Sequence, residues 1–382
     1  MKILEILKYM SKKINPYILA IDTSCDDTSV AVLKGRQVLS SIISSQVDLH
    51  KKWGGVVPSI ARRAHQENLP KVYQEALKRA QITEKNIDYI AVTYGPGLAI
   101  ALEVGIKFAQ DLALGKNKKL IPINHMEGHL LASLALNRNN KGIKSESSIF
   151  PALALLISGN HSEIVYVKRI GEYEILGETL DDAAGEAFDK VARMLNLGYP
   201  GGEILSNLAR QASTNWSKKE KGSKGLGRFG LPIPMLYSPD LNFSFSGLKT
   251  ACLYKIKELR ASGQKESNWS FDFAREFIEA LSASLLNKFK KALQKHPEIK
   301  SIIMGGGVSN NTFITRKFSN LAKEENKKYL LAEKRFRSDN AAMIGVAAYY
   351  NLKLKNFYLE KEKDILNLDR QPNLRLDDDY NS

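Results

Sequence analysis

The hydrophobic pattern begins with a short apolar run, a polar stretch and then two more apolar runs. Residues 17–22 are apolar up to a final aspartate, residues 23–28 are polar, and two β-branched segments follow between 29 and 45. Such runs, bounded by turn residues, predict three strands of a meander. A helical pattern from about 59 to 81 follows, and Pro70 should kink or split that helix.

The second half of the chain repeats this order. After the first meander, strands alternate with helices, and an apolar strand at 151–157 then starts a second series. A polar turn at 158–162 joins its first two strands, as residues 23–28 do in the first series. Duplication predicts an α/β fold of two similar lobes that face each other across a cleft. Two such turns would form a phosphate clamp.

The repeat also sets the expected domain bounds. The helix at about 339–365 is expected to pack back on the first lobe, and residues 213–230, rich in Lys, Ser and Gly, should form a mobile basic loop. The remaining expected parts are an N-terminal extension at 1–16, a first lobe at 17–137, a second lobe at 150–338 with a helical insertion at 181–296, and a flexible tail at 366–382.

Charge and cysteine content narrow the class of protein. The 382 residues include 56 Lys and Arg against 41 Asp and Glu, a formal net charge of +15. This excess favours a polyanionic partner, although AT-rich genomes encode lysine-rich proteins that have no such partner. The two cysteines, Cys25 and Cys252, form no disulfide framework, which favours a reducing cytoplasm. No apolar run reaches the roughly 18 residues of a transmembrane helix, and no signal peptide is evident.

The strongest local signal is His125-Met-Glu-Gly-His129. Histidines at i and i+4 lie on one helix face, where both imidazoles can reach one metal ion. A pair of surface or capping histidines would have the same spacing. A zinc protease needs glutamate directly after the first histidine, whereas Met126 stands there. Asp339, at the start of a late helix, is the candidate third ligand, with a helix N-cap as its alternative role.

Other polar segments could hold a phosphate, a ribose or a proton. The glycines at 305–307 lie between a strand and a helix, where main-chain amides can approach an anion. The acidic residues of 181–190 could bind a ribose or a metal, or could simply form ion pairs such as Glu186 with Lys190. In the first polar turn, Asp26 is the candidate general base, and Cys25 is a poor nucleophile among its acidic neighbours.

Five segments of the chain, taken together, resemble one family. Residues 21–28, 125–129, 181–190, 243–250 and 338–343 look like the bacterial form of the tRNA N6-adenosine threonylcarbamoyltransferase family, in the same order between about 17 and 352. The resemblance implies the actin-like, sugar-kinase-like (ribonuclease H-like) fold. It also implies one metal ion, most often iron(II) with zinc as the alternative, held by His125, His129 and Asp339. Adenylate or adenine nucleotide contacts are implied at Leu156, Ile157, Ser158, Gly159, Asn160, Asp189, Gly202 and Asn311.

The resemblance also implies a reaction and its partners. The family transfers threonylcarbamoyl from threonylcarbamoyl-adenylate, made by a separate synthase, to the adenosine 3′ of the anticodon in tRNAs that read codons beginning with A. Bacterial members work in the cytoplasm with a catalytically degenerate paralogue, as a heterodimer, and with a small P-loop ATPase. This sequence departs from the family at Asn160, where glycine is usual, and at Glu203, where proline is usual.

Three other functions remain open on the residues alone. An ATP-dependent kinase or ATPase would use the same turns, but it gives no reason for the paired histidines. A metalloprotease conflicts with the position of Glu127. A non-catalytic paralogue that scaffolds a modification complex should have lost the candidate metal ligands, and all three are present.

Overall fold

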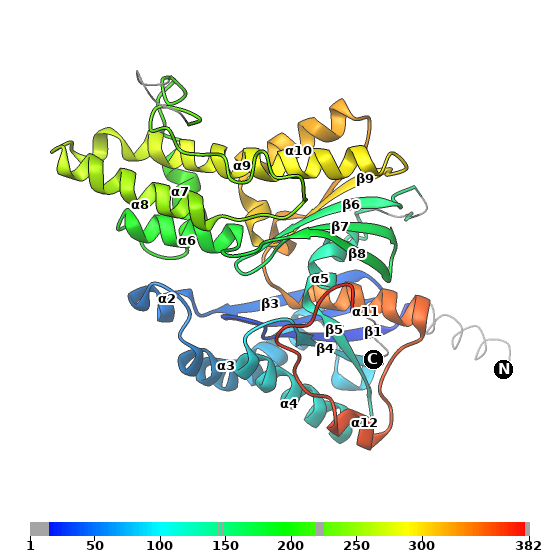
Figure 1. The fold of residues 1–382 in the computed structure, drawn as a ribbon. Coiled ribbons are helices and arrows are strands. Elements are labelled where there is room, and N and C mark those ends of the chain that lie inside the picture. Colours follow the sequence, from blue (N-terminus) through cyan, green and yellow to red (C-terminus); the bar gives the residue numbers. More distant parts are fainter. Residues whose placement is uncertain (1–14, 144, 147, 219–224, 379–382) are drawn as a thin grey trace, which may run out of the picture. The chain divides into compact units, whose positions relative to one another are not determined.

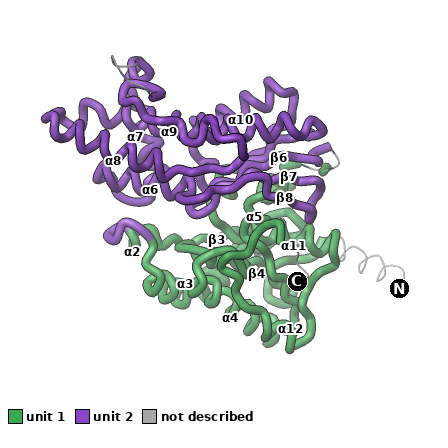
Figure 2. Tube along the Cα trace, in the orientation of Figure 1, with its two compact units in different colours: residues 1–50, 56–146, 332–382 green, residues 51–55, 147–331 purple. Residues whose placement is uncertain are grey.

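The computed structural model describes residues 15–143, 145–146, 148–218 and 225–378. The chain forms two compact units, which Figure 2 colours separately. Unit 1 contains residues 1–50, 56–146 and 332–382, and unit 2 contains residues 51–55 and 147–331.

The sheet of unit 1 has the strand order β3-β2-β1-β4-β5 (Figure 1). Strands β1, β2 and β3 form an antiparallel meander, whereas β4 and β5 continue the sheet parallel to β1. The carboxyl ends of β1, β4 and β5 therefore lie at one edge of this sheet. The strand bounds are Tyr17–Asp22 (β1), Asp27–Lys34 (β2), Gln37–Ser45 (β3), Tyr89–Gly95 (β4) and Lys119–Asn124 (β5).

Helices cover both faces of this sheet. Successive side chains of a strand point to opposite faces, and the buried residues of β1 and β2 therefore need helices on both sides. Leu19 and Ile21 of β1 share a core with residues of α3 and α4. On the other face, Leu33 of β2 lies so close to α11 that a Cβ on Gly345 would be 2.1 Å from its Cδ1. The helices of unit 1 are α2 (Val47–His50), α3 (Pro58–Ala80), α4 (Ala99–Gly115), α5 (His125–Leu131), α11 (Ala341–Lys355) and α12 (Glu362–Leu366).

Unit 2 repeats the same connectivity. Its sheet has the order β10-β9-β6-β7-β8, with an antiparallel meander from β6 to β8 and with β9 and β10 parallel to β6. The expected duplicated α/β fold is therefore confirmed. The strand bounds are Ala152–Ile157 (β6), Ser162–Arg169 (β7), Glu172–Glu178 (β8), Ser301–Gly305 (β9) and Lys328–Leu331 (β10).

The core of unit 2 lies between its sheet and a layer of long helices. Leu153, Leu155 and Ile157 of β6 pack with aromatic side chains of α9, among them Phe277 and Phe289. The helices are α6 (Ala184–Met194), α7 (Gly201–Ala209), α8 (Ser246–Ala261), α9 (Ser270–Lys295) and α10 (Thr312–Glu324). Short 3-10 turns in the two units are η1 (Lys51–Trp53), η2 (Glu84–Asn86), η3 (Ala132–Leu134), η4 (Glu266–Asn268), η5 (Gly307–Asn310) and η6 (Lys334–Phe336).

Three segments add detail to the expectations from sequence. Helix α3 runs unbroken through Pro70, so the proline does not split it. The described ends of the basic loop at 213–230 are held by α9, where Asp272 accepts from Ser213 N at 2.8 Å and Glu276 accepts from Phe229 N at 2.8 Å. The lysines at 219, 221 and 224 of this loop lie outside the described residues.

The described part of the C-terminal segment packs on unit 1. Gln371 N donates to the carbonyl of Tyr94 at 2.7 Å, Asn124 Nδ2 donates to the carbonyl of Arg375 at 2.9 Å, and the side chain of Leu376 is buried. Among the described residues, no helix has both the length and the apolar character that crossing a bilayer requires.

Candidate functional site

The paired histidines lie on α5, which starts directly at the end of β5. Asn124 is both the last residue of β5 and the N-cap of α5, because its Oδ1 accepts from Met126 N at 2.8 Å and from Glu127 N at 3.3 Å. This cap satisfies amides that the first helical turn would leave unpaired. His125 and His129 follow at i and i+4 on one face of α5, and both are buried.

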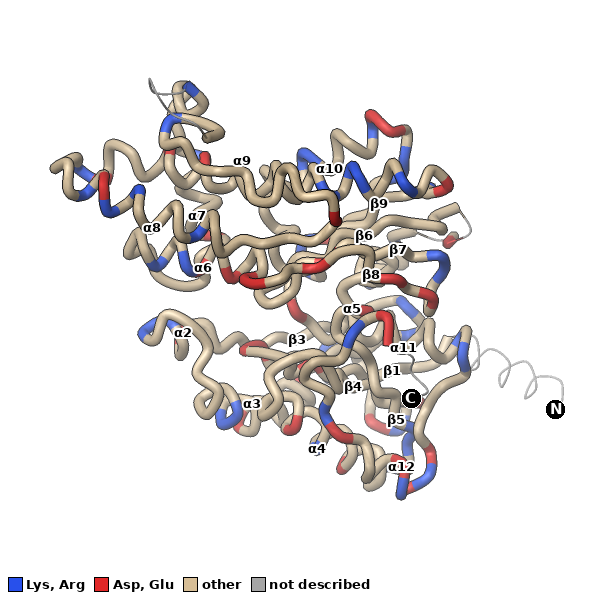
Figure 3. Tube along the Cα trace, in the orientation of Figure 1, with Lys and Arg blue, Asp and Glu red and all other residues tan. Residues whose placement is uncertain are grey.

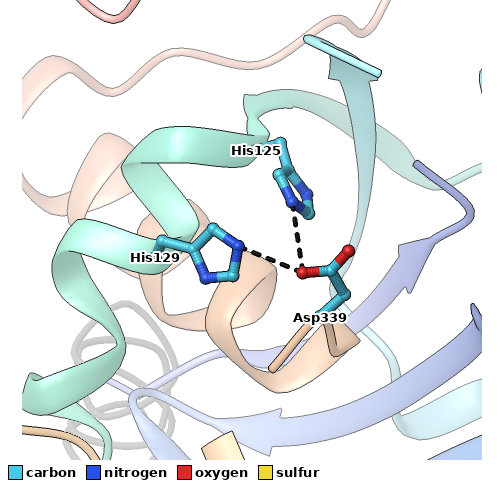
Figure 4. Close-up of side chains that lie close together, drawn as sticks. All are labelled: His125, His129 and Asp339. Carbon is cyan, nitrogen blue, oxygen red and sulfur yellow. Dashed lines mark ion pairs between the residues drawn. The ribbon is translucent and has the colours of Figure 1, made fainter. Parts of the chain in front are cut away.

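Asp339 reaches the same place from the segment before α11. The sequence left open whether Asp339 caps that helix, and the structure gives the cap to Asn340, whose Oδ1 accepts from Met343 N at 3.1 Å. Ala341 N donates to Ser29 Oγ of β2 at 2.9 Å, which fixes the start of α11 on the sheet of unit 1. The Asp339 carboxylate is thereby directed to the histidines (Figure 4).

The three side chains form a compact cluster. Asp339 Oδ1 lies 3.1 Å from His129 Nε2 and 3.6 Å from His125 Nε2 (Figure 4). One ligand atom from each residue lies within 4.8 Å of the others. His125 Nδ1 and His129 Nδ1 are buried without a hydrogen-bond partner among the described residues, whereas His129 Nε2 has the Asp339 carboxylate as its ion-pair partner. Two imidazoles and one carboxylate around unsatisfied nitrogen atoms fit a divalent transition metal with open coordination positions.

Asp22, the carboxylate at the end of the first strand, stands behind this cluster. Its Oδ1 lies 3.6 Å from His125 Nδ1, and its side chain is buried at the end of β1. A carboxylate behind a metal-binding histidine orients the ring and raises its basicity. An acid at the end of a first strand is a general sign of a metal or phosphate site, but its contact with His125 depends on how β1 and β5 lie within the sheet.

The buried charges shift one another strongly. Burial opposes a charge on His125, but Asp22 and Asp339 outweigh it and raise the pKa of His125 to about 10. Burial likewise opposes ionisation of Asp339, yet the two histidines hold its pKa well below the usual value. Burial lowers the pKa of His129. These shifts favour a protonated His125 beside an ionised Asp339.

The first polar turn also belongs to unit 1. Burial, with Asp26 and Asp339 nearby, raises the pKa of the Cys25 thiol well above its usual value, as expected for an unreactive cysteine. Burial raises the pKa of Asp27 to about 7. Asp26, the candidate base, lies in this turn, outside the cluster of His125, His129 and Asp339.

A buried histidine on α3 braces this turn, which the sequence gave no reason to expect. His65 Nδ1 lies 2.8 Å from Thr28 Oγ1, and His65 Nε2 lies 2.9 Å from the carbonyl oxygen of Cys25. Since a carbonyl only accepts, Nε2 carries the hydrogen and Nδ1 accepts from the Thr28 hydroxyl when the ring is neutral.

The candidate nucleotide residues all lie in unit 2. The side chains of Leu156 and Ile157 are fully buried in β6, so only their main chain could contact a ligand. Gly159 and Asn160 form an exposed turn, and neither has a positive φ. The left-handed backbone that would explain a glycine at position 160 is therefore not present.

The other three candidate nucleotide residues, Asp189, Gly202 and Asn311, are linked by hydrogen bonds to residues of α7. Asp189 Oδ1 accepts from Gly201 N at 2.7 Å, and Ser206 Oγ donates to the carbonyl of Gly202 at 2.6 Å. Asn311 Nδ2 donates to Ser206 Oγ at 2.9 Å, while Asn311 Oδ1 caps α10. These contacts link the start of α7 to the turn that follows β9.

The acidic residues of 181–190 pair with neighbours inside unit 2. Asp182 accepts from Lys190 at 2.7 Å and from Lys249 at 2.5 Å, and the expected ion pair of Glu186 with Lys190 is present at 2.7 Å. Asp181 accepts from Phe245 N at 2.8 Å, just before α8. Asp182 and Glu186 therefore form ion pairs, whereas Asp181 and Asp189 accept hydrogen bonds from main-chain amides.

The fold and the buried cluster define a duplicated α/β protein with a candidate metal centre, and comparison with known proteins identifies its family. A family model for tRNA N6-adenosine threonylcarbamoyltransferase matches residues 37–346. A relative of that name from Thermosipho melanesiensis is 45% identical over 359 residues, 94% of this chain and 99% of the relative. One from Clostridium kluyveri is 41% identical over 360 residues, 94% and 97% of the two chains. The chain belongs to the tRNA N6-adenosine threonylcarbamoyltransferase family, and it is a transferase that modifies tRNA.

Solved structures of other proteins share the fold. HypF from T. kodakarensis has a TM-score of 0.55 at 14% identity, covering 90% of this chain and 48% of HypF. A full-length HypF in a phosphate- and nucleotide-bound form has a TM-score of 0.51 at 12% identity, covering 89% of this chain and 47% of that one. At these identities the likeness concerns the fold alone, which agrees with the expected duplicated α/β fold.

Proposed function

We propose that this protein transfers threonylcarbamoyl from threonylcarbamoyl-adenylate to the N6 amine of the adenosine 3′ of the anticodon, in tRNAs that read codons beginning with A. The observation that carries the proposal is the buried cluster of His125, His129 and Asp339 in a chain of this transferase family. The three residues with metal-ligating chemistry are intact, as a catalytic member requires and a scaffold does not.

The chemistry is an acyl transfer from a mixed anhydride. The N6 amine attacks the carbamoyl carbon, a C–N bond forms, and the bond from that carbon to the phosphate oxygen breaks, so that AMP leaves with the bonding electrons. The proton lost from the amine passes to a base, for which Asp26 is our candidate. Because an aromatic amine is a weak nucleophile, holding it against the carbonyl should supply much of the rate.

His125, His129 and Asp339 would hold one divalent metal ion, which we propose is iron(II), with zinc as the alternative. When bound, such an ion supplies a Lewis acid for carbonyl or phosphoryl oxygens. Asp22 would keep the His125 ring oriented through Nδ1, 3.6 Å from its carboxylate.

We assign the adenylate to unit 2, at the turn of Ser158 to Asn160 and the glycines that follow β9. Gly159 and Asn160 are exposed, and small residues there let main-chain amides approach a phosphate. Asp189, Gly202 and Asn311 would support this site through the start of α7.

Basic side chains of both units are candidates for tRNA phosphate contacts. Arg62 and Arg63 are exposed on α3, and Lys257 and Arg260 are exposed on α8. Figure 3 colours the Lys and Arg positions along the chain blue. Such contacts position an RNA without reading its sequence. The proposed protein partners are a degenerate paralogue in a heterodimer, a small P-loop ATPase and the synthase that supplies the adenylate, all in the bacterial cytoplasm.

Reconstitution tests this function. Unmodified tRNA, threonine, bicarbonate, ATP and the synthase are incubated with the protein, with and without the partner proteins, and nucleosides are analysed by mass spectrometry. We expect threonylcarbamoyladenosine from the wild type, its loss in His125→Ala, and its retention in a matched control, His296→Ala in unit 2. Absence of product with every partner set, despite folded and metal-loaded protein, would refute the proposal.

A further inference from the structure

The acid between the two histidines has a buried partner on another helix. Glu127 of α5 is 1% exposed, and its Oε2 accepts from Asn351 Nδ2 of α11 at 2.9 Å. Asn351 is 3% exposed and also donates to the carbonyl of Ala347 at 3.2 Å. A buried carboxylate is costly unless hydrogen bonds satisfy it, so this contact holds only while the two helices keep their positions.

The two helices are those that carry the candidate ligands. His125 and His129 belong to α5, and Asp339 stands just before α11. The N-caps Asn124 and Asn340 fix where α5 and α11 begin, but they do not fix how one helix lies against the other. The spacing between the histidines and the aspartate depends on how α5 lies against α11.

A second contact between these helices is made by the next residue, Gly128. A Cβ placed on Gly128 would lie 2.9 Å from Ile344 Cδ1 and 3.2 Å from Met343 Cγ, so a larger residue would require these two side chains to shift. Ile344 and Asn351 are about 10 Å apart along α11 at 1.5 Å per residue. Two contacts this far apart restrain both the sliding and the tilt of one helix against the other.

We propose that Glu127 and Asn351 are positioning residues of the metal site, which set the register of α5 against α11 and thereby the distance from His125 and His129 to Asp339. The proposal rests on the metal site assigned above. Under this proposal Glu127 is not the catalytic glutamate that a metalloprotease would need. Its role requires no contact with substrate or metal.

The geometry permits a reciprocal test. Asn351→Asp removes the donor and sets two carboxylates against each other. Glu127→Gln keeps an oxygen that can accept from Asn351. In the double variant the amide introduced at position 127 can donate to the carboxylate introduced at position 351, so the hydrogen bond is restored with its direction reversed.

The measurement is metal affinity by competition with a chromophoric chelator, using Co(II) and Zn(II), beside the unfolding midpoint of the metal-free protein. We expect Asn351→Asp to weaken binding by about tenfold or more, as loss of an outer-shell contact does. We expect Glu127→Gln and the double variant to stay within about threefold of the wild type by the same scale. Asn351→Ala, which adds no charge, replaces Asn351→Asp if the latter fails to fold, and it too should weaken binding.

Two controls separate the possible failures. Asn356→Ala removes the residue with positive φ that ends α11 and should lower stability without changing affinity. If Asn351→Asp and Asn351→Ala bind metal like the wild type, Glu127 and Asn351 serve the core alone and the positioning role is wrong. If the wild type binds no better than His129→Ala, the metal site itself is wrong, and the positioning proposal is overturned with it.

Discussion

The two units share one strand order but carry different chemistry. In unit 1 the turn after the first strand is bordered by Asp22, Asp26 and Asp27, and histidines follow β5 directly. In unit 2 the turn after β6 contains no acidic residue, and Gly306 and Gly307 follow β9, which is the counterpart of β4 in unit 1. The acids and histidines at the end of the unit 1 sheet would bind through side chains, whereas the contacts proposed for unit 2 are made by main chain.

This difference predicts how each unit responds to substitution. A ligand made by a side chain can be removed with little effect on the fold, whereas a main-chain site depends on the backbone path. Changes at the cluster of unit 1 should therefore alter binding more than stability. Changes at the glycines of unit 2 should alter stability first.

The largest effect is expected from Asp339→Ala in unit 1. Its carboxylate is the only oxygen ligand of the three-residue cluster, so we expect metal affinity to fall by at least about a thousandfold, or roughly 4 kcal/mol. The unfolding free energy of the metal-free protein should fall by less, about 1 to 3 kcal/mol, because the variant also loses the ion pairs with His125 and His129. Chelator competition and denaturant unfolding measure the two quantities.

Asp369→Ala is the matched control, because Asp369 is an exposed aspartate of unit 1 that pairs with Arg370. It should leave metal affinity unchanged. An Asp339→Ala protein that binds metal as well as this control would break the assignment of side-chain chemistry to unit 1.

The next effect is expected in unit 2, from Gly306→Ala. Gly306 has φ +86°, and a Cβ there would lie 2.3 Å from the carbonyl oxygen of Ile157. Backbone strain and this clash should cost about 3 kcal/mol of unfolding free energy. Gly307→Ala is the control, since a Cβ on Gly307 meets nothing within 4 Å. Equal unfolding midpoints for the two variants would contradict a turn whose path requires glycine.

Much of this organisation could be predicted from sequence. The duplicated strand order follows from apolar runs and turn residues, and the spacing of His125 and His129 places them on one helix face. The convergence of Asp339 on these histidines could be anticipated only through the family resemblance. No local pattern brings together residues that stand so far apart in the chain.

The contacts around the cluster could not be predicted, for a physical reason. Asp22 lies near His125 because β1 and β5 belong to one sheet with β4 between them, and Glu127 meets Asn351 because α5 packs on α11. These are consequences of tertiary packing. The cap of α11 was also ambiguous, since both Asp339 and Asn340 are good capping residues.

A smaller effect concerns the pH dependence of the turn in unit 1. Burial lowers the pKa of His65 below its usual value of about 6.5. Between about pH 6.5 and the lower pKa of folded His65, the unfolded chain therefore binds more protons than the folded chain. The unfolding free energy falls over this range as pH falls, by at most about 1.4 kcal/mol per pH unit. Above about 6.5 the contribution of His65 is constant.

His65→Gln should therefore flatten the fall in unfolding free energy between about pH 6.5 and 5. The pKa of Asp27 is raised to about 7, so its contribution to the unfolding free energy grows as pH falls, opposite to that of His65. Both proteins contain Asp27, and subtracting the unfolding free energy of the variant from that of the wild type removes this contribution. His296→Gln in unit 2 is the control. A difference that does not vary with pH would show that His65 braces the turn without titrating.

The smallest effect is expected from Asn160→Gly, which restores the residue usual in the family. Asn160 is exposed and has no positive φ, so glycine relieves no strain and only adds freedom to the unfolded chain. We expect a loss of about 0.5 kcal/mol in unfolding free energy and transfer activity within about threefold of the wild type. Since unit 2 is assigned main-chain contacts, the side chain at 160 should matter little. An activity gain of more than about tenfold would mean that the asparagine obstructs the adenylate, and that side chains govern this turn as they do the one in unit 1.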